Sequence, residues 1–226
     1  MIKFQNITKT YPPDTTVLDK VSFEVKNGEF VSIVGRSGAG KTTLIRLLLG
    51  LEEPTSGEVL FDDNDVHKIK PNQLQKLRRE IGVVYQDYKL LPAKTVYENI
   101  AYVMEVKGKN DQEIKKEVTQ ILEITGLSEK INNFPYELSG GEQQRLAIAR
   151  ATVSQPDVVV ADEPTGNLDP YNTYEVVALL KKFNEMGKTV ILATHDKEVV
   201  NKLGKRVITL DQGKVIRDDP EGKFIL

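Results

Sequence analysis

At residues 35–43 the chain reads Gly35-Arg36-Ser37-Gly38-Ala39-Gly40-Lys41-Thr42-Thr43. This segment fits the pattern of a glycine, four variable residues and then Gly-Lys-Ser/Thr, which surrounds the phosphates of a bound nucleotide. Residues 29–34 predict a buried strand before it, and the apolar spacing within 44–48 predicts a helix after it. Glycines allow backbone N–H groups to approach an anion closely, and the start of a helix attracts negative charge. We therefore expect Lys41 to reach the β- and γ-phosphates and the Thr42 hydroxyl to ligate Mg²⁺.

The composition limits the kinds of partner and compartment. The 226 residues include 31 basic and 33 acidic side chains, which give a net charge of −2. This balance gives no general attraction to nucleic acid or anionic lipid, so we expect no nucleic-acid partner. The absence of cysteine excludes disulfides and thiolate metal sites, and it fits a reducing cytosol. No apolar run approaches the roughly 18 residues of a membrane span, and residues 1–6 lack the apolar core of a signal peptide. The sequence therefore predicts a soluble, cytosolic protein.

Strands and helices alternate along most of the chain. Residues 1–30 predict β structure, because apolar and polar side chains alternate there, most strictly over 21–25. Asn27-Gly28 predicts a type I′ hairpin turn into the strand that precedes the phosphate-binding loop. This alternation predicts an α/β fold with a parallel sheet. Further strands are predicted at 58–61, 81–85, 158–163 and 189–194, helices at 71–80 and 170–186, and a terminal hairpin over 206–217.

One part of the chain departs from this alternation. Thr95 and Glu98 form a capping box that opens one helix, and residues 111–125 predict a second helix with no strand between them. An all-helical insertion in an alternating chain predicts a subdomain, which we place at about 87–150.

A second capping box opens the helix that follows residue 139. Ser139 stands at the N-cap and Glu142 three residues later. Gly140 and Gly141 lie between them, and two glycines weaken the first turn of a helix, so they need a reason. Close approach of an anion to their N–H groups is one reason. A plain capped helix is the other, and both interpretations stay open at this point.

Acidic residues follow a buried strand in the second half of the chain. Residues 158–161 are apolar and run directly into Asp162 and Glu163. The carboxyl ends of parallel strands form the ligand-binding edge of such sheets, so both carboxylates are expected there. Asp162 would hold Mg²⁺ through its water shell, and Glu163 would polarise an attacking water. His195 ends the strand 189–194 at the same edge, where it can contact the γ-phosphate.

These motifs together resemble the nucleotide-binding subunit of an ATP-binding-cassette (ABC) transporter, over essentially the whole chain. Residues 138–143, Leu-Ser-Gly-Gly-Glu-Gln, match the signature of that family. Gln86 matches its Q-loop, residues 167–169 its D-loop and His195 its switch histidine. Tyr11 matches the aromatic residue that stacks on adenine.

The resemblance implies a fold and a reaction. The fold is a P-loop NTPase with a RecA-like parallel-sheet core, an N-terminal antiparallel β subdomain and a helical subdomain. Residues 1–226 would form a single ABC ATPase domain, with the catalytic core and β subdomain in 1–86 and 151–226 and the helical signature subdomain in about 87–150. The cofactors would be ATP and Mg²⁺, and water would attack the γ-phosphate in line.

The resemblance also implies a role for each matching residue. Glu163 would polarise the attacking water, His195 would hold the γ-phosphate, and Lys41 and Gln86 would complete the catalytic set. The expected metal-binding residues are Thr42, Gln86 and Asp162. The residues expected to contact nucleotide are Tyr11, Gly35, Arg36, Ser37, Gly38, Ala39, Gly40, Lys41, Thr42 and Thr43, joined by Ser139, Gly140, Gly141, Glu142 and Asp169 from a second copy in an ATP-dependent head-to-tail homodimer.

Within the family, residues 88–100 are similar to the segment after the Q-loop in a subgroup that works in bacterial cell division. There the ATPase acts with a membrane protein that controls cell-wall hydrolases. We therefore expect an integral membrane partner that docks near Tyr88–Pro92 and holds the chain at the cytoplasmic face of the inner or plasma membrane. Leu90 and Leu91 would contact it, although both can equally be core residues. The alternative is an ATPase for lipoprotein release or macrolide efflux, which shares the rest of the pattern.

Other classes of protein fit less well. A GTPase needs an Asn-Lys-x-Asp motif, and the nearest segment, residues 201–204, lacks the aspartate. ABC ATPases of DNA repair carry a long coiled-coil insertion, and those of translation usually carry two cassettes; neither feature occurs in this sequence. A non-enzymatic scaffold is disfavoured because every expected catalytic position is filled.

Overall fold

The computed structural model describes residues 1–224 and contains two β-sheets. The first sheet is antiparallel, with the strand order β2-β1-β4-β5. The second has the order β10-β9-β3-β8-β7-β6, and only its edge strand β10 runs antiparallel to its neighbour. The first sheet consists of β1 (Ile2–Tyr11), β2 (Thr15–Val25), β4 (Ser56–Phe61) and β5 (Asn64–Asp65); the second consists of β3 (Phe30–Val34), β6 (Ile81–Tyr85), β7 (Val158–Asp162), β8 (Thr189–Thr194), β9 (Arg206–Asp211) and β10 (Lys214–Asp219).

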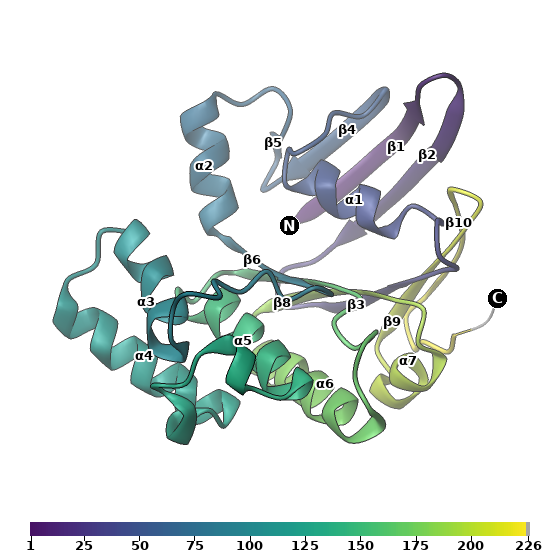
Figure 1. Ribbon diagram of the computed structural model, residues 1–226. Helices are drawn as coiled ribbons and strands as arrows, with labels where there is room; N and C mark the ends of the chain where they lie inside the picture. Colours follow the sequence, from purple (N-terminus) through teal and green to yellow (C-terminus); the bar gives the residue numbers. More distant parts are fainter. Residues whose placement is uncertain (225–226) are drawn as a thin grey trace.

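The six-stranded sheet separates two hydrophobic cores. Its central strands are apolar on both faces, so alternate residues of one strand enter different cores. In β7, Val158 and Val160 join the core that contains the antiparallel sheet, whereas Val159 and Ala161 join the core on the opposite face. Figure 1 shows α1 (Lys41–Leu48) between the two sheets and the helices from α3 (Val96–Val106) to α6 (Pro170–Glu185) on the far side of the six-stranded sheet.

The helices begin where the sequence predicts helix starts. Thr95 accepts a hydrogen bond from the N–H of Glu98, whose carboxylate accepts one from the N–H of Thr95, which confirms that capping box. The predicted helix over 111–125 is confirmed at both ends. Within residues 1–224 the α-helices are α1 (Lys41–Leu48), α2 (Pro71–Arg79), α3 (Val96–Val106), α4 (Asp111–Thr125), α5 (Gly140–Thr152), α6 (Pro170–Glu185) and α7 (Lys197–Leu203), with short 3₁₀ turns η1 (Ser128–Lys130) and η2 (Pro135–Glu137).

The turn predicted at Asn27-Gly28 is not a hairpin. Strand β2 pairs with β1 in the antiparallel sheet, whereas β3 pairs with β8 and β9 in the other sheet. Gly28 has a φ of +73°, but Asn27 lies outside the left-handed region that a type I′ turn also requires there. The Gly28 N–H donates a hydrogen bond to the Thr189 hydroxyl, and the Gly28 carbonyl oxygen accepts one from the Asn184 side chain. Contacts with β8 and α6 therefore hold the turn at which the chain passes from one sheet to the other.

Helices α3, α4 and α5 follow β6 with no intervening strand, since the next strand in the described residues is β7. Helix α5 extends past residue 150 to Thr152. The limits of a separate helical subdomain stay a proposal, and residues 225–226 of the predicted single domain lie outside the described part. Among residues 1–224, no helix combines the length and the apolar character that crossing a bilayer requires.

Candidate functional site

The loop between β3 and α1 is built around its glycines. A Cβ atom on Gly35 would lie 2.5 Å from the Leu210 carbonyl oxygen, and Gly40 has a φ of +102°. Lys41 follows at the start of α1 with a side chain only 6 % exposed. Its Nζ donates to the carbonyl oxygens of Gly35, at 2.8 Å, and Arg36, at 3.3 Å. The loop therefore surrounds the ammonium group of Lys41 and leads directly into the N-terminus of α1.

Three charged or polar side chains form a chain along the edge of the sheet. Lys41 Nζ lies 3.1 Å from Glu163 Oε1, and Glu163 Oε2 lies 3.0 Å from His195 Nδ1. The residues follow β3, β7 and β8, which are neighbours in the order β3-β8-β7, so their carboxyl ends meet. Glu163 has a φ of +48°, and this left-handed conformation is uncommon for residues other than glycine. The strained backbone turns Glu163 out of its strand toward the other two side chains.

Thr42 and Asp162 form a second pair beside this chain. The Thr42 hydroxyl donates to Asp162 Oδ2 at 2.8 Å, while Asp162 Oδ1 is buried with no hydrogen-bond partner among residues 1–224. Burial raises the pKa of Asp162; the bond from Thr42 lowers it, and the nearby Glu163 charge raises it further. A buried carboxylate oxygen without a partner, next to a hydroxyl, matches the oxygen ligands that Mg²⁺ prefers. The residues present therefore fit the predicted metal ion.

Gln86 directly follows β6 at the same edge and is exposed. A Cβ atom on Gly166 would lie 2.9 Å from Gln86 Nε2, so this amide lies against the turn that follows Glu163. The structure thus brings the six predicted catalytic and metal-binding residues to one edge: Lys41, Thr42, Gln86, Asp162, Glu163 and His195.

Tyr11 ends β1, and its hydroxyl donates to Glu52 Oε2. Arg46 and Lys9 also contact Glu52, through its Oε1 at 2.9 Å and its Oε2 at 3.8 Å. The family resemblance predicts Tyr11 near the nucleotide, but it gives no indication of Glu52 or Arg46. No sequence signal marks them, because the Tyr11–Glu52 contact joins residues 41 positions apart.

The capping box at Ser139 is confirmed. The N–H of Glu142 donates to Ser139 Oγ at 3.3 Å, and the N–H of Ser139 donates to Glu142 Oε2 at 2.8 Å. The backbone bond from Ser139 lowers the pKa of Glu142. A Cβ atom on Gly141 would lie 1.8 Å from Asn172 Oδ1, so close packing against α6 requires a glycine there. Packing against α6 therefore explains the glycine at position 141 within a single chain. The sequence alone did not predict this contact.

Asp169 caps helix α6. Its Oδ1 accepts from the N–H groups of Tyr171, at 2.9 Å, and Asn172, at 3.0 Å, and these bonds lower its pKa. In the described residues, the hydrogen bonds and ion pairs of the capping box at 139–142 do not reach the loop at 35–43. Helices α1 and α5 pack in the two different cores. Within one chain, the loop at 35–43 and the capping box at 139–142, which are both predicted to contact phosphate, therefore lie apart.

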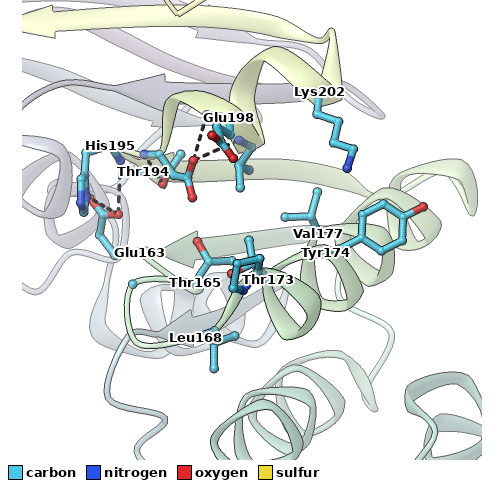
Figure 2. Close-up of a pocket in the computed structure, with 14 residues that line it drawn as sticks. Glu163, Thr165, Leu168, Thr173, Tyr174, Val177, Thr194, His195, Glu198 and Lys202 are labelled. Atoms are coloured by element: carbon cyan, nitrogen blue, oxygen red, sulfur yellow. Dashed lines mark hydrogen bonds and ion pairs between the residues drawn. The ribbon is translucent and has the colours of Figure 1, made fainter.

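A cleft of about 470 Å³ adjoins the sheet edge that carries Glu163 and His195, between α6, α7 and the ends of β7 and β8. Figure 2 shows Glu163 and His195 at one end of it and Tyr174 and Lys202 at the other. Lys202 Nζ lies 4.8 Å from the centre of the Tyr174 ring. Glu163 therefore lines this cleft while its two carboxylate oxygens contact Lys41 and His195.

The predicted docking segment is held by its own helices. Arg150 donates to the carbonyl oxygens of Lys89, at 2.7 Å, and Tyr88, at 2.9 Å. Leu90 is half-buried and packs against the core of α3 to α6, and the Leu91 N–H donates to the buried Asn99 at 2.9 Å. Leu90 thus packs with the core residues of this face, and Lys89 and Pro92 are the exposed members of the segment.

Comparison with known proteins gives concordant results. Residues 18–166 match the family model described as ABC transporter. The chain is 50 % identical over 224 residues to the cell division ATP-binding protein FtsE of Streptococcus pneumoniae serotype 2 (strain D39 / NCTC 7466), covering 99 % of this chain and 97 % of that protein. It is 47 % identical to FtsE of Bacillus subtilis (strain 168), with 99 % and 98 % covered.

The fold is also similar to that of a solved structure. The ATP-binding cassette MJ0796, in a dimeric post-hydrolysis state bound to ADP and Pi, superposes with a TM-score of 0.89 at 39 % identity. The match covers 99 % of this chain and 100 % of that one.

Proposed function

The chain belongs to the ABC transporter family as an FtsE-like ATPase of cell division, and from this premise we propose how its own residues bind and hydrolyse ATP. The observation that carries the proposal is the chain of contacts from Lys41 through Glu163 to His195, next to the Thr42–Asp162 pair. It joins a cation, a carboxylate and an imidazole at the end of the phosphate-binding loop.

The phosphates would lie on the loop at 35–43. Its backbone N–H groups and the start of α1 neutralise negative charge, and Lys41 turns from the Gly35 and Arg36 carbonyl oxygens to the β- and γ-phosphates. This movement also releases Oε1 of Glu163 from its ion pair. The same lysine thus links phosphate binding to the freeing of the carboxylate.

Thr42, Gln86 and Asp162 would hold Mg²⁺, with Asp162 acting through the waters of the ion. When bound, the ion neutralises charge on the β- and γ-phosphate oxygens. Support comes from Oδ1 of Asp162, which is buried and has no partner among the described residues. A cation near this oxygen would compensate the cost of burying the charged carboxylate.

Glu163 would accept a proton from the water that attacks the γ-phosphate. Its second oxygen stays on His195 Nδ1, which keeps the carboxylate oriented while Oε1 is free. The other imidazole nitrogen, Nε2, would hold the γ-phosphate by donating a hydrogen bond, which requires the imidazolium form with a proton on both nitrogens. Tyr11 would stack on the adenine at the far end of the nucleotide.

A second copy and a membrane subunit would complete the working complex. Ser139, Gly140 and Gly141 would meet the γ-phosphate bound to the partner copy, with Glu142 and Asp169 in the same interface. An FtsX-like membrane subunit would dock near Tyr88–Pro92, hold the chain at the cytoplasmic membrane face, and pass ATP cycling to cell-wall hydrolysis. Support for the partner comes from the FtsE relatives, and support for the dimer from the dimeric cassette.

The test is Glu163→Gln, which keeps the size of the side chain and removes its basicity. Mg-ATP should bind with unchanged affinity, and turnover should fall by at least about 10²-fold, because general bases contribute on that order. Phosphate release and nucleotide binding are measured on the same preparation. Glu198→Gln is the matched control, since Glu198 lines the same cleft without contacting Lys41 or His195. Wild-type turnover in Glu163→Gln would remove Glu163 from this role.

The same variant tests the partner. Slow hydrolysis should trap the ATP-bound complex, so affinity capture of Glu163→Gln from native membranes with Mg-ATP should recover the membrane subunit. A small protein with an FtsX-like extracytoplasmic domain would support the cell-wall role. Recovery of a lipoprotein-release or efflux permease would overturn that role and leave the hydrolysis proposal intact.

A further inference from the structure

Glu52 collects three side chains from two other elements. It lies in the segment after α1, and its carboxylate accepts a hydrogen bond from the Tyr11 hydroxyl. Arg46 Nη1 lies 2.9 Å from Oε1, and Lys9 Nζ lies 3.8 Å from Oε2. The Glu52 side chain is 20 % exposed, so these contacts replace most of its water. Glu52 is a fixed acceptor between β1 and α1.

The charges on this group agree with its geometry. The hydrogen bond from Tyr11 lowers the pKa of Glu52, against the opposing effect of burial, and Arg46 lowers it further. Burial and the bond to Glu52 raise the pKa of Tyr11. The carboxyl group is therefore ionised and the phenol protonated at neutral pH, which makes this a charge-assisted bond with a defined donor and acceptor.

The contacts also fix the position of the Tyr11 ring. Tyr11 ends β1 in the antiparallel sheet, whereas Arg46 lies on α1, the helix that begins with Lys41. Glu52 joins the two, so the distance between the ring and the phosphate-binding loop depends on this carboxylate. Without the bridge, the hydroxyl would lose its carboxylate acceptor, so fewer contacts would select one rotamer of the tyrosine.

Lys9 occupies one face of the same ring. Its Nζ lies 5.0 Å from the ring centre and donates to the Glu53 carbonyl oxygen at 2.7 Å. The segment that carries Glu52 therefore also holds the cation that covers the ring. A base that stacks on Tyr11 would use the opposite face.

We propose that Glu52 is a positioning residue for base recognition, which sets the Tyr11 ring at the distance from the phosphate-binding loop that a nucleoside triphosphate requires. This inference rests on the proposed ATP site, and in particular on stacking of the base on Tyr11. Glu52 touches neither base nor phosphate; it acts through the tyrosine hydroxyl.

The experiment compares two ligands that differ in the base. Dissociation constants for Mg-ATP and for Mg-tripolyphosphate, which has no base, are measured for the wild type, Glu52→Ala, Tyr11→Phe and the double variant. Glu52→Ala should weaken Mg-ATP by about tenfold, within the range of losing one aromatic–base stack, and leave Mg-tripolyphosphate unchanged. Glu53→Ala removes the same charge one position away and should bind both ligands as the wild type does.

The double-mutant cycle tests the route of the effect. Tyr11→Phe keeps the ring and removes the hydroxyl, so it should reproduce the loss in Glu52→Ala, and the double variant should lose no more than either single one. Additive losses would overturn the proposal, because Glu52 would then act independently of the hydroxyl. Equal weakening of both ligands in Glu52→Ala would also overturn it, by showing a general disturbance of the loop.

A further variant separates this proposal from the proposed function. Tyr11→Ala should weaken Mg-ATP at least as much as Glu52→Ala does. Wild-type affinity for Mg-ATP in Tyr11→Ala would overturn the base-stacking role and the positioning role together. A weakened Tyr11→Ala with an unaffected Glu52→Ala would overturn only the role of Glu52. If Glu52→Ala fails to fold, Tyr11→Phe alone decides, because unchanged Mg-ATP affinity there contradicts the proposal.

Discussion

Individual side chains at this site are held in costly arrangements. Glu163 adopts a left-handed backbone conformation, and Asp162 is buried with one oxygen that has no partner among the described residues. Both features oppose folding, and both place an acidic oxygen where a phosphate-bound cation or an attacking water is expected. The two features that lower the stability of the fold therefore both lie at the proposed site of reaction.

Asp162→Asn should therefore stabilise the protein while impairing its chemistry. The amide has no charge to bury, so we expect the free energy of unfolding to rise by on the order of 1 kcal/mol, which corresponds to about 2–4 °C in the melting temperature for a chain of this size. Thermal melts in the absence of nucleotide and Mg²⁺ measure the gain. Turnover of Mg-ATP in the same variant should fall.

The gain should depend on pH in a defined direction. Burial raises the pKa of Asp162 above its unfolded value of about 4. The carboxyl group therefore favours the folded state only below that pH, and its ionisation destabilises the folded state as pH rises through the folded-state pKa. Asp162→Asn should raise the melting temperature more at pH 8 than at pH 4. An equal increment at both values would contradict burial of the charge as the cause.

Residues of this kind differ in how far sequence predicts them. Lys41 was predicted from the phosphate-loop motif, whereas Glu163 and His195 were predicted at one edge because each follows a buried parallel strand. The contact between Lys41 and Glu163 was not expected, since sequence pattern gives no side-chain conformation. Glu52 was missed because its contact with Tyr11 depends on how the antiparallel sheet packs over α1, and no local spacing encodes that packing.

At the scale of elements, helix ends followed from local chemistry and strand partners did not. A capping box involves residues three positions apart, so the starts of α3 and α5 could be predicted from the sequence. The turn at Asn27-Gly28 has the local composition of a hairpin, yet β3 joins a different sheet from β2. All five residues of strand β3 are buried, which fits a position inside a parallel sheet that is covered on both faces.

Substitutions at Gly140 and Gly141, in the first turn of α5, can distinguish a role in helix packing from a role in phosphate contact. Gly141→Ala should destabilise the fold by about 1–3 kcal/mol, the usual cost of overpacking, because its Cβ would lie 1.8 Å from Asn172 Oδ1. Asn172→Ala in the same chain should restore part of the loss. Denaturant unfolding measures both effects.

Gly140→Ala is the matched control. The nearest atom to its Cβ would be the Tyr88 hydroxyl at 3.4 Å, so its stability should stay close to that of the wild type. If the first turn of α5 also meets a γ-phosphate, Gly140→Ala should still reduce ATP-dependent dimerisation. A stable Gly141→Ala protein would show that the contact with Asn172 does not require glycine.

At the scale of the whole molecule, the two segments that we propose as halves of a nucleotide site do not meet within one chain. The loop at 35–43 belongs to the core around α1, and the capping box at 139–142 belongs to the core on the opposite face of the sheet. The sequence could show that both segments exist, because each is a local motif. Their separation within the chain is a property of the sheet and its crossovers, which a single sequence does not display.

The head-to-tail dimer makes a prediction that only a shared site can satisfy. Lys41→Ala removes the phosphate contact of one half-site, and Ser139→Arg blocks the other half-site with a bulky cation. Each variant alone should be inactive. In an equal mixture, a mixed dimer combines the intact loop of one chain with the intact signature of the other and so contains one complete site. About half of the dimers in the mixture are mixed, and each mixed dimer has one complete site out of two. Activity should therefore return to about a quarter of the wild-type value. Phosphate release from the mixture measures it, and a mixture as inactive as its components would place both segments in sites formed by a single chain.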